Sequence, residues 1–187
     1  MIKKIFKLFI FEFSQLILWF ILSYPDSRIG LSIRRSYWKK KLKSCGKNLE
    51  LRRGSAIGFP SIIEIGNNFI LGNFAHITAA RSKGIYIGDN VSISRGTYFH
   101  GSNHKFDNPN KPIMEQGTES ASLDYKNKTY SIVICDDVWI GSNAVILSGT
   151  YLSNGCIVSS GSVVSGFYDE YSIIGGNPAR FVKKRFK

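Results

Sequence analysis

Residues 136–166 read DDVWIGSNAVILSGTYLSNGCIVSSGSVVSG, and an aliphatic residue returns at every sixth position of this stretch. The series begins just before the stretch at Ile134 and continues at Ile140, Ile146, Leu152, Val158 and Val164. One hexad is long enough for a short strand and a turn, so three hexads close a triangular coil, and successive coils stack at strand spacing. Chance spacing in a β-sandwich would not keep this register through consecutive hexads. The period therefore predicts an all-β solenoid, a parallel β-helix.

The same register continues toward the N-terminus and extends the predicted β-helix over residues 48–175. Its earlier anchors are Ile87, Ile93 and Phe99, preceded by Ile65, Leu71 and Ile77, with Leu51 and Ile57 as a weaker start. A small or slim residue stands four positions after an anchor at Ala75, Val91, Thr97, Val138, Ala144, Thr150, Cys156 and Ser162. Two inward positions per hexad suit a narrow prism, and intervening Asn and Gly residues suit turns with positive φ.

The register breaks at two places. Ile77 and Ile87 are ten residues apart, which is four more than one hexad. Phe99 and Ile134 are 35 residues apart, which is 29 more than one hexad. A prism accepts insertions only at its corners, so both segments are predicted to protrude, the longer one as a loop over residues 100–131. Long loops on a rigid scaffold are where function is usually placed.

Length and charge limit the classes of function. A chain of 187 residues, 43% of them hydrophobic and without a Pro- or Ser-rich linker, is expected to form one main domain. The net charge of +12 divides into +9 for residues 1–47 (11 basic, 2 acidic), +5 for residues 180–187 and −2 for residues 48–179. We expect no nucleic-acid partner, because the repeat has no basic stripe. Three cysteines without paired spacing favour a reducing cytoplasm over a disulfide framework.

Residues 1–47 form an N-terminal helical segment that is both apolar and basic. In its opening, MIKKIFKLFIFEFSQLILWFILSY, one half of a helical wheel holds Lys3, Lys4, Lys7, Glu12, Ser14 and Gln15. The other half is wholly apolar, which is typical of a helix lying in a membrane interface. A membrane span is disfavoured because Glu12 would lie near its centre. A secretory signal is not expected either, because no small-residue cleavage site follows the apolar stretch.

A second basic stretch, SIRRSYWKKKLK, contributes Arg34, Arg35, Lys39, Lys40, Lys41 and Lys43. Each cation near an anionic leaflet favours binding by about 1 kcal/mol. We therefore expect residues 1–43 to contact an anionic membrane surface. The alternative is a helix that packs on its own subunit or across an oligomer, with the basic residues solvated.

Five pieces of residues 85–187 resemble the hexapeptide-repeat acyltransferases of the maltose, galactoside and polysaccharide O-acetyltransferase group. They are IGDN (87–90), NHKFDNPNKPIMEQG (103–117), DDVWIGSNAVILSG (136–149), SGSVVS (160–165) and GGNPARFVKK (175–184), in the order of that family. The resemblance implies a left-handed β-helix, a homotrimer with active sites between subunits, and acetyl-CoA as the donor without a metal. The chain departs from the family pattern at two places. Cys135 stands where the family usually has glycine, and GFYDEYS (166–172) replaces a stretch in which a lysine that contacts coenzyme A is expected.

The resemblance also implies roles for individual residues. His104 is the expected general base, since a neutral imidazole can accept the proton of a sugar hydroxyl. Asp107 is a candidate to orient that ring, and the Ser142 amide is expected to stabilise the oxyanion. Residues expected to bind the cofactor are Trp139, Gly141, Ser142, Ser160, Ser165, Asn177, Arg180, Lys183 and Lys184, the last three in a C-terminal basic tail (176–187) that would pair with phosphates.

His76 and His100 are expected near one prism corner, where they and Asn103 would contact the acceptor. Three histidines on neighbouring coils also suggest the metal site of trimeric β-helical carbonic anhydrases, but the NHKFD and NPAR pieces favour acyl transfer without a metal. The leading expectation is O-acetylation of a bacterial surface-polysaccharide sugar or its precursor, in the cytoplasm and peripheral to the inner membrane. N-acetylation of a nucleotide-linked amino sugar and a noncatalytic binding module are the alternatives.

Overall fold

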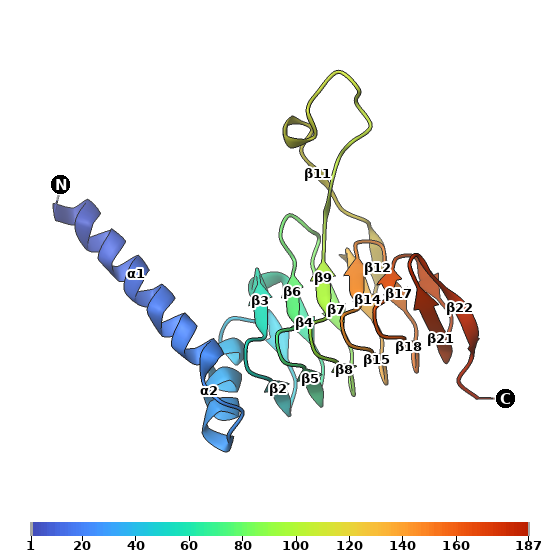
Figure 1. Ribbon diagram of the computed structural model, residues 1–187, viewed down its shortest axis with the longest axis horizontal. Coiled ribbons are helices and arrows are strands. Elements are labelled where there is room, and N and C mark those ends of the chain that lie inside the picture. The colour runs from blue at the N-terminus through green and yellow to red at the C-terminus, as the bar shows by residue number, and fades with distance from the viewer. Residues whose placement is uncertain (1, 187) are drawn as a thin grey trace.

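The computed structural model describes residues 2–186, with side chains from residue 6 onward, as a triangular β-prism with a helical N-terminal segment (Figure 1). Three sheets form the walls of the prism. Sheet A contains β1 (Ser44–Cys45), β4 (Ile63–Ile65), β7 (Ile85–Ile87), β14 (Ile132–Ile134), β17 (Tyr151–Leu152) and β20 (Phe167–Tyr168). Sheet B contains β2 (Leu49–Leu51), β5 (Phe69–Leu71), β8 (Ser92–Ile93), β15 (Trp139–Ile140), β18 (Ile157–Val158), β21 (Ser172–Gly176) and β22 (Ala179–Lys184). Sheet C contains β3 (Ala56–Gly58), β6 (His76–Thr78), β9 (Tyr98–His100), β16 (Val145–Leu147) and β19 (Val163–Val164).

The predicted six-residue period is confirmed. Strands three hexads apart pair in parallel, so that Ile134 lies beside Ile87 on one side and Leu152 on the other. Every predicted anchor has an exposed fraction of 4% or less, and the slim positions between them are buried as well. The repeat therefore forms one continuous core along the axis of the prism.

The N-terminal segment contains α1 (Ile2–Ser23) and α2 (Arg28–Lys39). The Ser27 side chain caps α2 by accepting a hydrogen bond from the Gly30 N–H (3.1 Å). Trp38 at the end of α2 and Leu42 after it join the core, so α2 closes the N-terminal end of the prism. α1 instead extends away from the prism (Figure 1).

The C-terminal residues fold back onto the prism. Strand β22 pairs antiparallel with β21 and covers the last coil, and its first residue, Ala179, is buried in the core. Residues 179–184 of the expected basic tail (176–187) therefore form a strand with one register shift against β21, and Arg185 after it pairs with Asp137 (2.7 Å).

The long excursion between β9 and β14 has two differently built parts. Its first part contains β10 (Asn103–His104), η2 (Ile113–Glu115) and β11 (Thr118–Glu119) and protrudes from the prism (Figure 1). Its second part is a hairpin of β12 (Leu123–Tyr125) and β13 (Lys128–Tyr130). Buried Tyr130 packs with Val133, so the hairpin covers the outer face of sheet A.

Candidate active site

Insertions gather at one edge of the prism, where the chain passes from sheet C to sheet A. On three successive coils this connection is extended, by residues 59–62 with η1 (Pro60–Ile62), by residues 79–84 and by residues 101–131. The next coil makes the same passage with residues 148–150 alone. We call this edge the inserted corner. Its first insertion was missed from the sequence, although the eight-residue spacing of Ile57 and Ile65 is the signal for it.

The inserted corner surrounds a cavity of about 300 Å³. Its lining residues are Phe59, Ala80, Arg81, His100, Ser102, Asn103, His104 and Thr118. Each of the three insertions contributes at least one of them. The structure therefore brings together three predicted site residues, His100, Asn103 and His104, and adds Phe59, Arg81 and Thr118, which sequence motifs did not indicate.

Backbone contacts between coils position the base of the long loop. The Gly101 N–H donates to the Thr78 carbonyl (3.0 Å), and the Ser102 hydroxyl donates to the Ala80 carbonyl (2.8 Å). Beyond them, His104 pairs with Thr118 across the β10–β11 ladder. The His104 side chain is exposed and lines the cavity, so a ligand can reach its imidazole.

His100 and His76 lie on either side of an aromatic ring. The Tyr98 ring is 5.4 Å from the His76 ring and 5.8 Å from the His100 ring, between ring centroids. Burial, and then the proximity of His100, lower the pKa of His76. His76 does not line the cavity, which makes a direct contact with the acceptor a weaker expectation for it than for His100.

The geometry of His100 assigns its tautomer. Its Nδ1 lies 3.0 Å from the Ser102 carbonyl oxygen, and since a carbonyl can only accept, Nδ1 carries the proton. In the neutral ring Nε2 is then free to accept a hydrogen bond from a ligand. His100 therefore suits acceptor binding beside His104.

Asp107 lies farther out in the loop and does not line the cavity. Within residues 6–186 no hydrogen bond joins Asp107 to His104, so its expected orienting role has no contact to support it in this arrangement. Among the same residues, no group of three or more His, Cys, Asp or Glu side chains is arranged to hold a metal ion.

Ser142 lies at the opposite end of the sheet C strands from His104. The chain enters β16 three residues after Ser142 and leaves β9, its neighbour, four residues before His104. Within residues 6–186 the Ser142 N–H has no hydrogen-bond partner, so it can donate to a ligand. Gly141 must be a glycine here, because a Cβ would lie 2.6 Å from the Ser160 nitrogen. One chain therefore does not bring His104 and Ser142 together.

Trp139 begins a line of side chains on the outer face of sheet B. Its indole N–H donates to the Ser94 hydroxyl (3.1 Å), and its ring is exposed. The residues paired with it on successive strands are Ile157, Ile173 and Lys183. Directly paired residues point to the same face, so this line leads from the Ser142 turn to a basic residue on β22.

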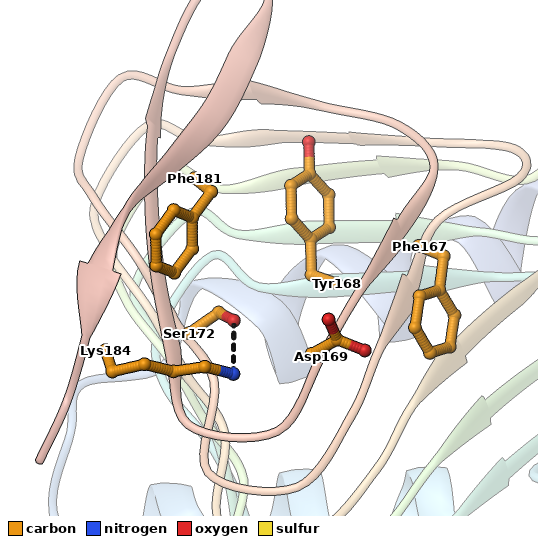
Figure 2. Close-up of a pocket in the computed structure, with 6 residues that line it drawn as sticks. All are labelled: Phe167, Tyr168, Asp169, Ser172, Phe181 and Lys184. Carbon is orange, nitrogen blue, oxygen red and sulfur yellow. Dashed lines mark hydrogen bonds between the residues drawn. The ribbon is translucent and has the colours of Figure 1, made fainter.

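The remaining predicted cofactor residues lie toward the C-terminal end and are exposed; they are Ser160, Ser165, Asn177, Arg180, Lys183 and Lys184. Lys184 donates to the Glu170 carbonyl (2.6 Å) and lines a separate pocket of about 240 Å³ together with Phe167 and Phe181 (Figure 2). Because the Lys184 ammonium is engaged in this internal contact, Lys184 is less suited than Lys183 to pair with a phosphate of coenzyme A.

The chain is similar to one family model and to several named acetyltransferases. A family model described as bacterial transferase hexapeptide (six repeats) matches residues 131–166. A chloramphenicol acetyltransferase of Klebsiella aerogenes is 36% identical over 109 residues, 54% of this chain and 52% of that protein. WbbJ of Escherichia coli K12, whose name proposes an O-acetyl transferase of lipopolysaccharide biosynthesis, is 29% identical over 130 residues, 66% of this chain and 61% of WbbJ. The chain thus spans about half to three fifths of these relatives.

Solved structures share the fold. A maltose O-acetyltransferase of Clostridium difficile 630 superposes with a TM-score of 0.71 at 20% identity, covering 94% of this chain and 86% of that one. A galactoside acetyltransferase in complex with coenzyme A superposes with a TM-score of 0.67 at 23% identity, covering 91% of this chain and 78% of that one. The chain is therefore a left-handed β-helix that carries the bacterial transferase hexapeptide repeat, and its resemblance to the maltose, galactoside and polysaccharide O-acetyltransferase group is confirmed.

Proposed function

We propose that the chain is an acetyl-CoA-dependent O-acetyltransferase that modifies a sugar hydroxyl of a bacterial surface polysaccharide or of its precursor. The observation that carries the proposal is the exposed His104 of the NHKFD piece at a cavity built by three insertions. Relatives named as acetyltransferases, among them WbbJ, support the reaction class and the polysaccharide acceptor.

His104 acts as the general base. A sugar hydroxyl is a poor nucleophile at neutral pH, and its oxygen attacks the thioester carbonyl as the imidazole takes its proton. The new C–O bond forms a tetrahedral intermediate whose oxyanion accepts a hydrogen bond from the Ser142 N–H. Collapse of the intermediate breaks the C–S bond, and the leaving thiolate recovers a proton from the imidazolium.

The donor lies along sheet B. Trp139, Ile157 and Ile173 offer an apolar track for the pantetheine arm, beginning at the Ser142 turn. Three strand spacings of about 4.8 Å separate Trp139 from Lys183, so the track reaches a cation that can pair with a coenzyme A phosphate. Exposed Arg180 on the same strand is a second phosphate partner.

The acceptor occupies the cavity at the inserted corner. Exposed Phe59 offers a flat apolar surface for a sugar ring, while Arg81, Asn103 and the free Nε2 of His100 offer hydrogen bonds to its hydroxyls. We expect Arg81→Ala to raise KM for the acceptor more than it lowers kcat, since Arg81 does not contact the reacting atoms.

A homotrimer completes the site. Because His104 and Ser142 lie at opposite ends of sheet C in one chain, a productive pair needs His104 of one copy beside Ser142 of another. The β12–β13 hairpin covers sheet A, which leaves the outer faces of sheets B and C for contact between copies. Light scattering should give three chains per particle. A monomer that still turns over would contradict the shared site.

Two measurements test the function. Calorimetric titration should detect binding of acetyl-CoA, and release of free coenzyme A thiol should depend on an acceptor from a panel of sugars with free hydroxyls. Absence of acetyl-CoA binding would favour a noncatalytic binding module. Turnover only with nucleotide-linked amino sugars, with the product acetylated on nitrogen, would favour the N-acetyltransferase alternative.

A further inference from the structure

Helix α1 presents a long apolar surface that the prism leaves uncovered. Its segment Phe6–Ser23 contains only two charged residues, Lys7 and Glu12, and only 6% of the segment is buried. Large apolar side chains that are 44–66% exposed comprise Phe6, Leu8, Phe9, Ile10, Phe11, Phe13, Leu16, Ile17, Trp19 and Phe20. An apolar surface of this length on a soluble domain marks an interaction site.

The two sides of α1 differ in chemistry. At 100° per residue, Phe9, Phe13, Leu16 and Phe20 fall within about 60° of one another. Lys7, Ser14 and Gln15 lie on the other side, where the Ser14 hydroxyl is satisfied by the Phe11 carbonyl (2.6 Å). Phe11 and Trp19 also lie on that second side, so it is mixed in character, whereas the Phe9–Phe13–Leu16–Phe20 face is wholly apolar and suits hydrocarbon.

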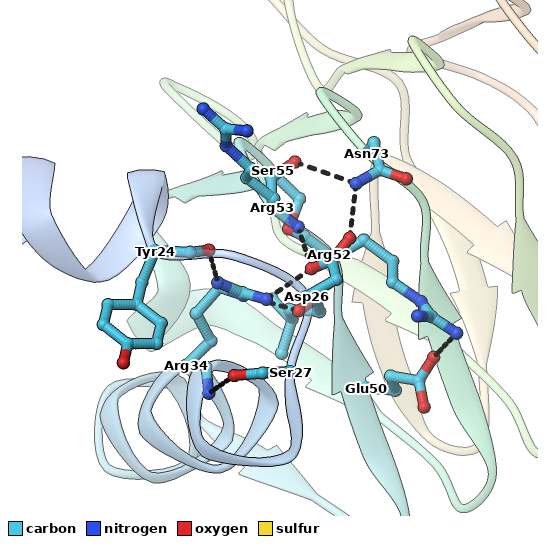
Figure 3. Close-up of polar contacts among 11 residues, drawn as sticks. Tyr24, Asp26, Ser27, Arg34, Glu50, Arg52, Arg53, Ser55 and Asn73 are labelled. Atoms are coloured by element: carbon cyan, nitrogen blue, oxygen red, sulfur yellow. Dashed lines mark hydrogen bonds and ion pairs between the residues drawn. The ribbon is translucent and has the colours of Figure 1, made fainter.

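A polar cluster fixes the base of α1 to the prism (Figure 3). Buried Arg34 pairs with Asp26 (2.5 Å) and donates to the Tyr24 carbonyl (2.6 Å). Asp26 also accepts hydrogen bonds from the Arg53 N–H (2.7 Å) and the Asn73 side chain (2.7 Å). The helix thus leaves the prism from a braced junction rather than from a free linker.

The cluster corrects part of the charge count made from the sequence. Arg34 is fully buried and is therefore not available to a membrane, while the charge of the half-exposed Lys43 is offset by its ion pair with Glu64 (2.8 Å). Exposed cations on α2 and directly after it include Arg28, Arg35, Lys39, Lys40 and Lys41, and Lys7 adds another on α1. Their sign matches an anionic lipid headgroup.

We infer that α1 lies in the interface of an anionic bilayer, with the Phe9–Phe13–Leu16–Phe20 face in the acyl region, and holds the prism at the membrane surface. Glu12 and Lys7 oppose a spanning mode, because both would enter the hydrocarbon core. The acceptor proposed above would be met there when it is attached to a lipid carrier, but the anchoring does not depend on the transferase activity.

Adjacent residues on opposite faces provide a matched test. Leu16→Glu and Gln15→Glu introduce the same charge one position apart, in the full chain. We expect the native chain to float with vesicles that contain phosphatidylglycerol and to float less with phosphatidylcholine alone. Leu16→Glu should lower the partition at least about tenfold, since a buried leucine is lost and a carboxylate must enter the acyl region. Gln15→Glu should stay within about twofold of the native chain.

Three results would contradict the inference. An equal loss of vesicle binding in both variants would indicate a spanning helix. Failure of the native chain to float with vesicles would exclude a lipid partner. A native chain that floats no better than Leu16→Glu, together with a change in particle mass for that variant, would place α1 in a protein interface. Acetyl-CoA binding should be the same in all variants, so failure here is distinct from failure of the proposed function.

Discussion

The two corners that bound sheet C show how the same coil is used for structure and for chemistry. Between sheets B and C, each coil turns with a few residues and one of them has positive φ, at Gly54 (73°), Phe74 (57°), Gly96 (70°), Asn143 (56°) and Gly161 (71°). Backbone hydrogen bonds link these turns, as from the Gly161 N–H to the Ser142 carbonyl (2.9 Å). The inserted corner breaks the register three times and contains the cavity with His104. A strict period builds the scaffold, and its interruptions carry the site.

The largest effect is expected for His104→Ala at the inserted corner. Loss of a general base should lower kcat by about 10² to 10⁴ with little change in acetyl-CoA affinity. The side chain is exposed, so the free energy of unfolding should stay within about 0.5 kcal/mol of the native value. Steady-state kinetics and chemical denaturation measure the two quantities.

His76 supplies the matched control for that variant. His76→Gln changes a histidine of sheet C that does not line the cavity, and it should affect KM more than kcat. In the native chain kcat/KM should fall on the acidic side as the base is protonated, and this limb should be absent from His104→Ala. Native kcat with an intact limb in His104→Ala would assign the base elsewhere.

A second test compares the scaffold with the protruding loop. Ile146 on β16 is fully buried, and Ile146→Ala should lower the free energy of unfolding by about 2–5 kcal/mol. Phe106, two residues beyond His104, is 72% exposed, and Phe106→Ala should change the free energy of unfolding by less than about 0.5 kcal/mol. Urea denaturation measures both. Equal losses would mean that the loop is part of the cooperative core.

The period in the sequence predicted the β-helix well because each coil repeats a local rule. Burial at Ile134 and Ile146 follows from their spacing alone, and the NHKFD piece indicated His104. Phe59 and Arg81 were missed because their role arises only when insertions on different coils stack at one corner. The hairpin was missed for a similar reason, since its partner on sheet A is Glu64, far away in the chain.

A third test concerns how the long excursion is attached to the prism. Glu64 pairs with Lys43 (2.8 Å) and Lys128 (3.0 Å) and accepts a hydrogen bond from the Tyr130 hydroxyl (3.0 Å). Burial raises the pKa of Glu64, but these three partners outweigh it and hold the pKa at about 2, below the usual 4.5. The stabilisation is therefore complete above about pH 4.5 and is lost as the pH falls toward 2.

Glu64→Gln should remove that pH dependence. The free energy of unfolding of the variant should be about 1–3 kcal/mol lower than that of the native chain at neutral pH, and it should fall less steeply as the pH is lowered. Hydrogen exchange should locate the loss in the β12–β13 hairpin. An unchanged acid limb in Glu64→Gln would show that the carboxylate does not hold the hairpin.

The smallest expected effect compares a turn of the coil with the protruding loop through backbone conformation alone. Gly161 (φ +71°) and Gly117 (φ +81°) both have left-handed backbone, and no atom lies within 4 Å of a Cβ added at either position. Alanine at each therefore pays a conformational cost of about 1 kcal/mol without a clash. Gly161 turns a coil that is linked to the preceding coil by the hydrogen bond from its N–H to the Ser142 carbonyl (2.9 Å), so Gly161→Ala should lower the global free energy of unfolding by about that amount. Gly117 lies in the protruding loop, where the chain can relax or open locally, so Gly117→Ala should change the global value by less than about 0.5 kcal/mol. Equal losses in urea denaturation would show that the loop and the coil unfold as one unit.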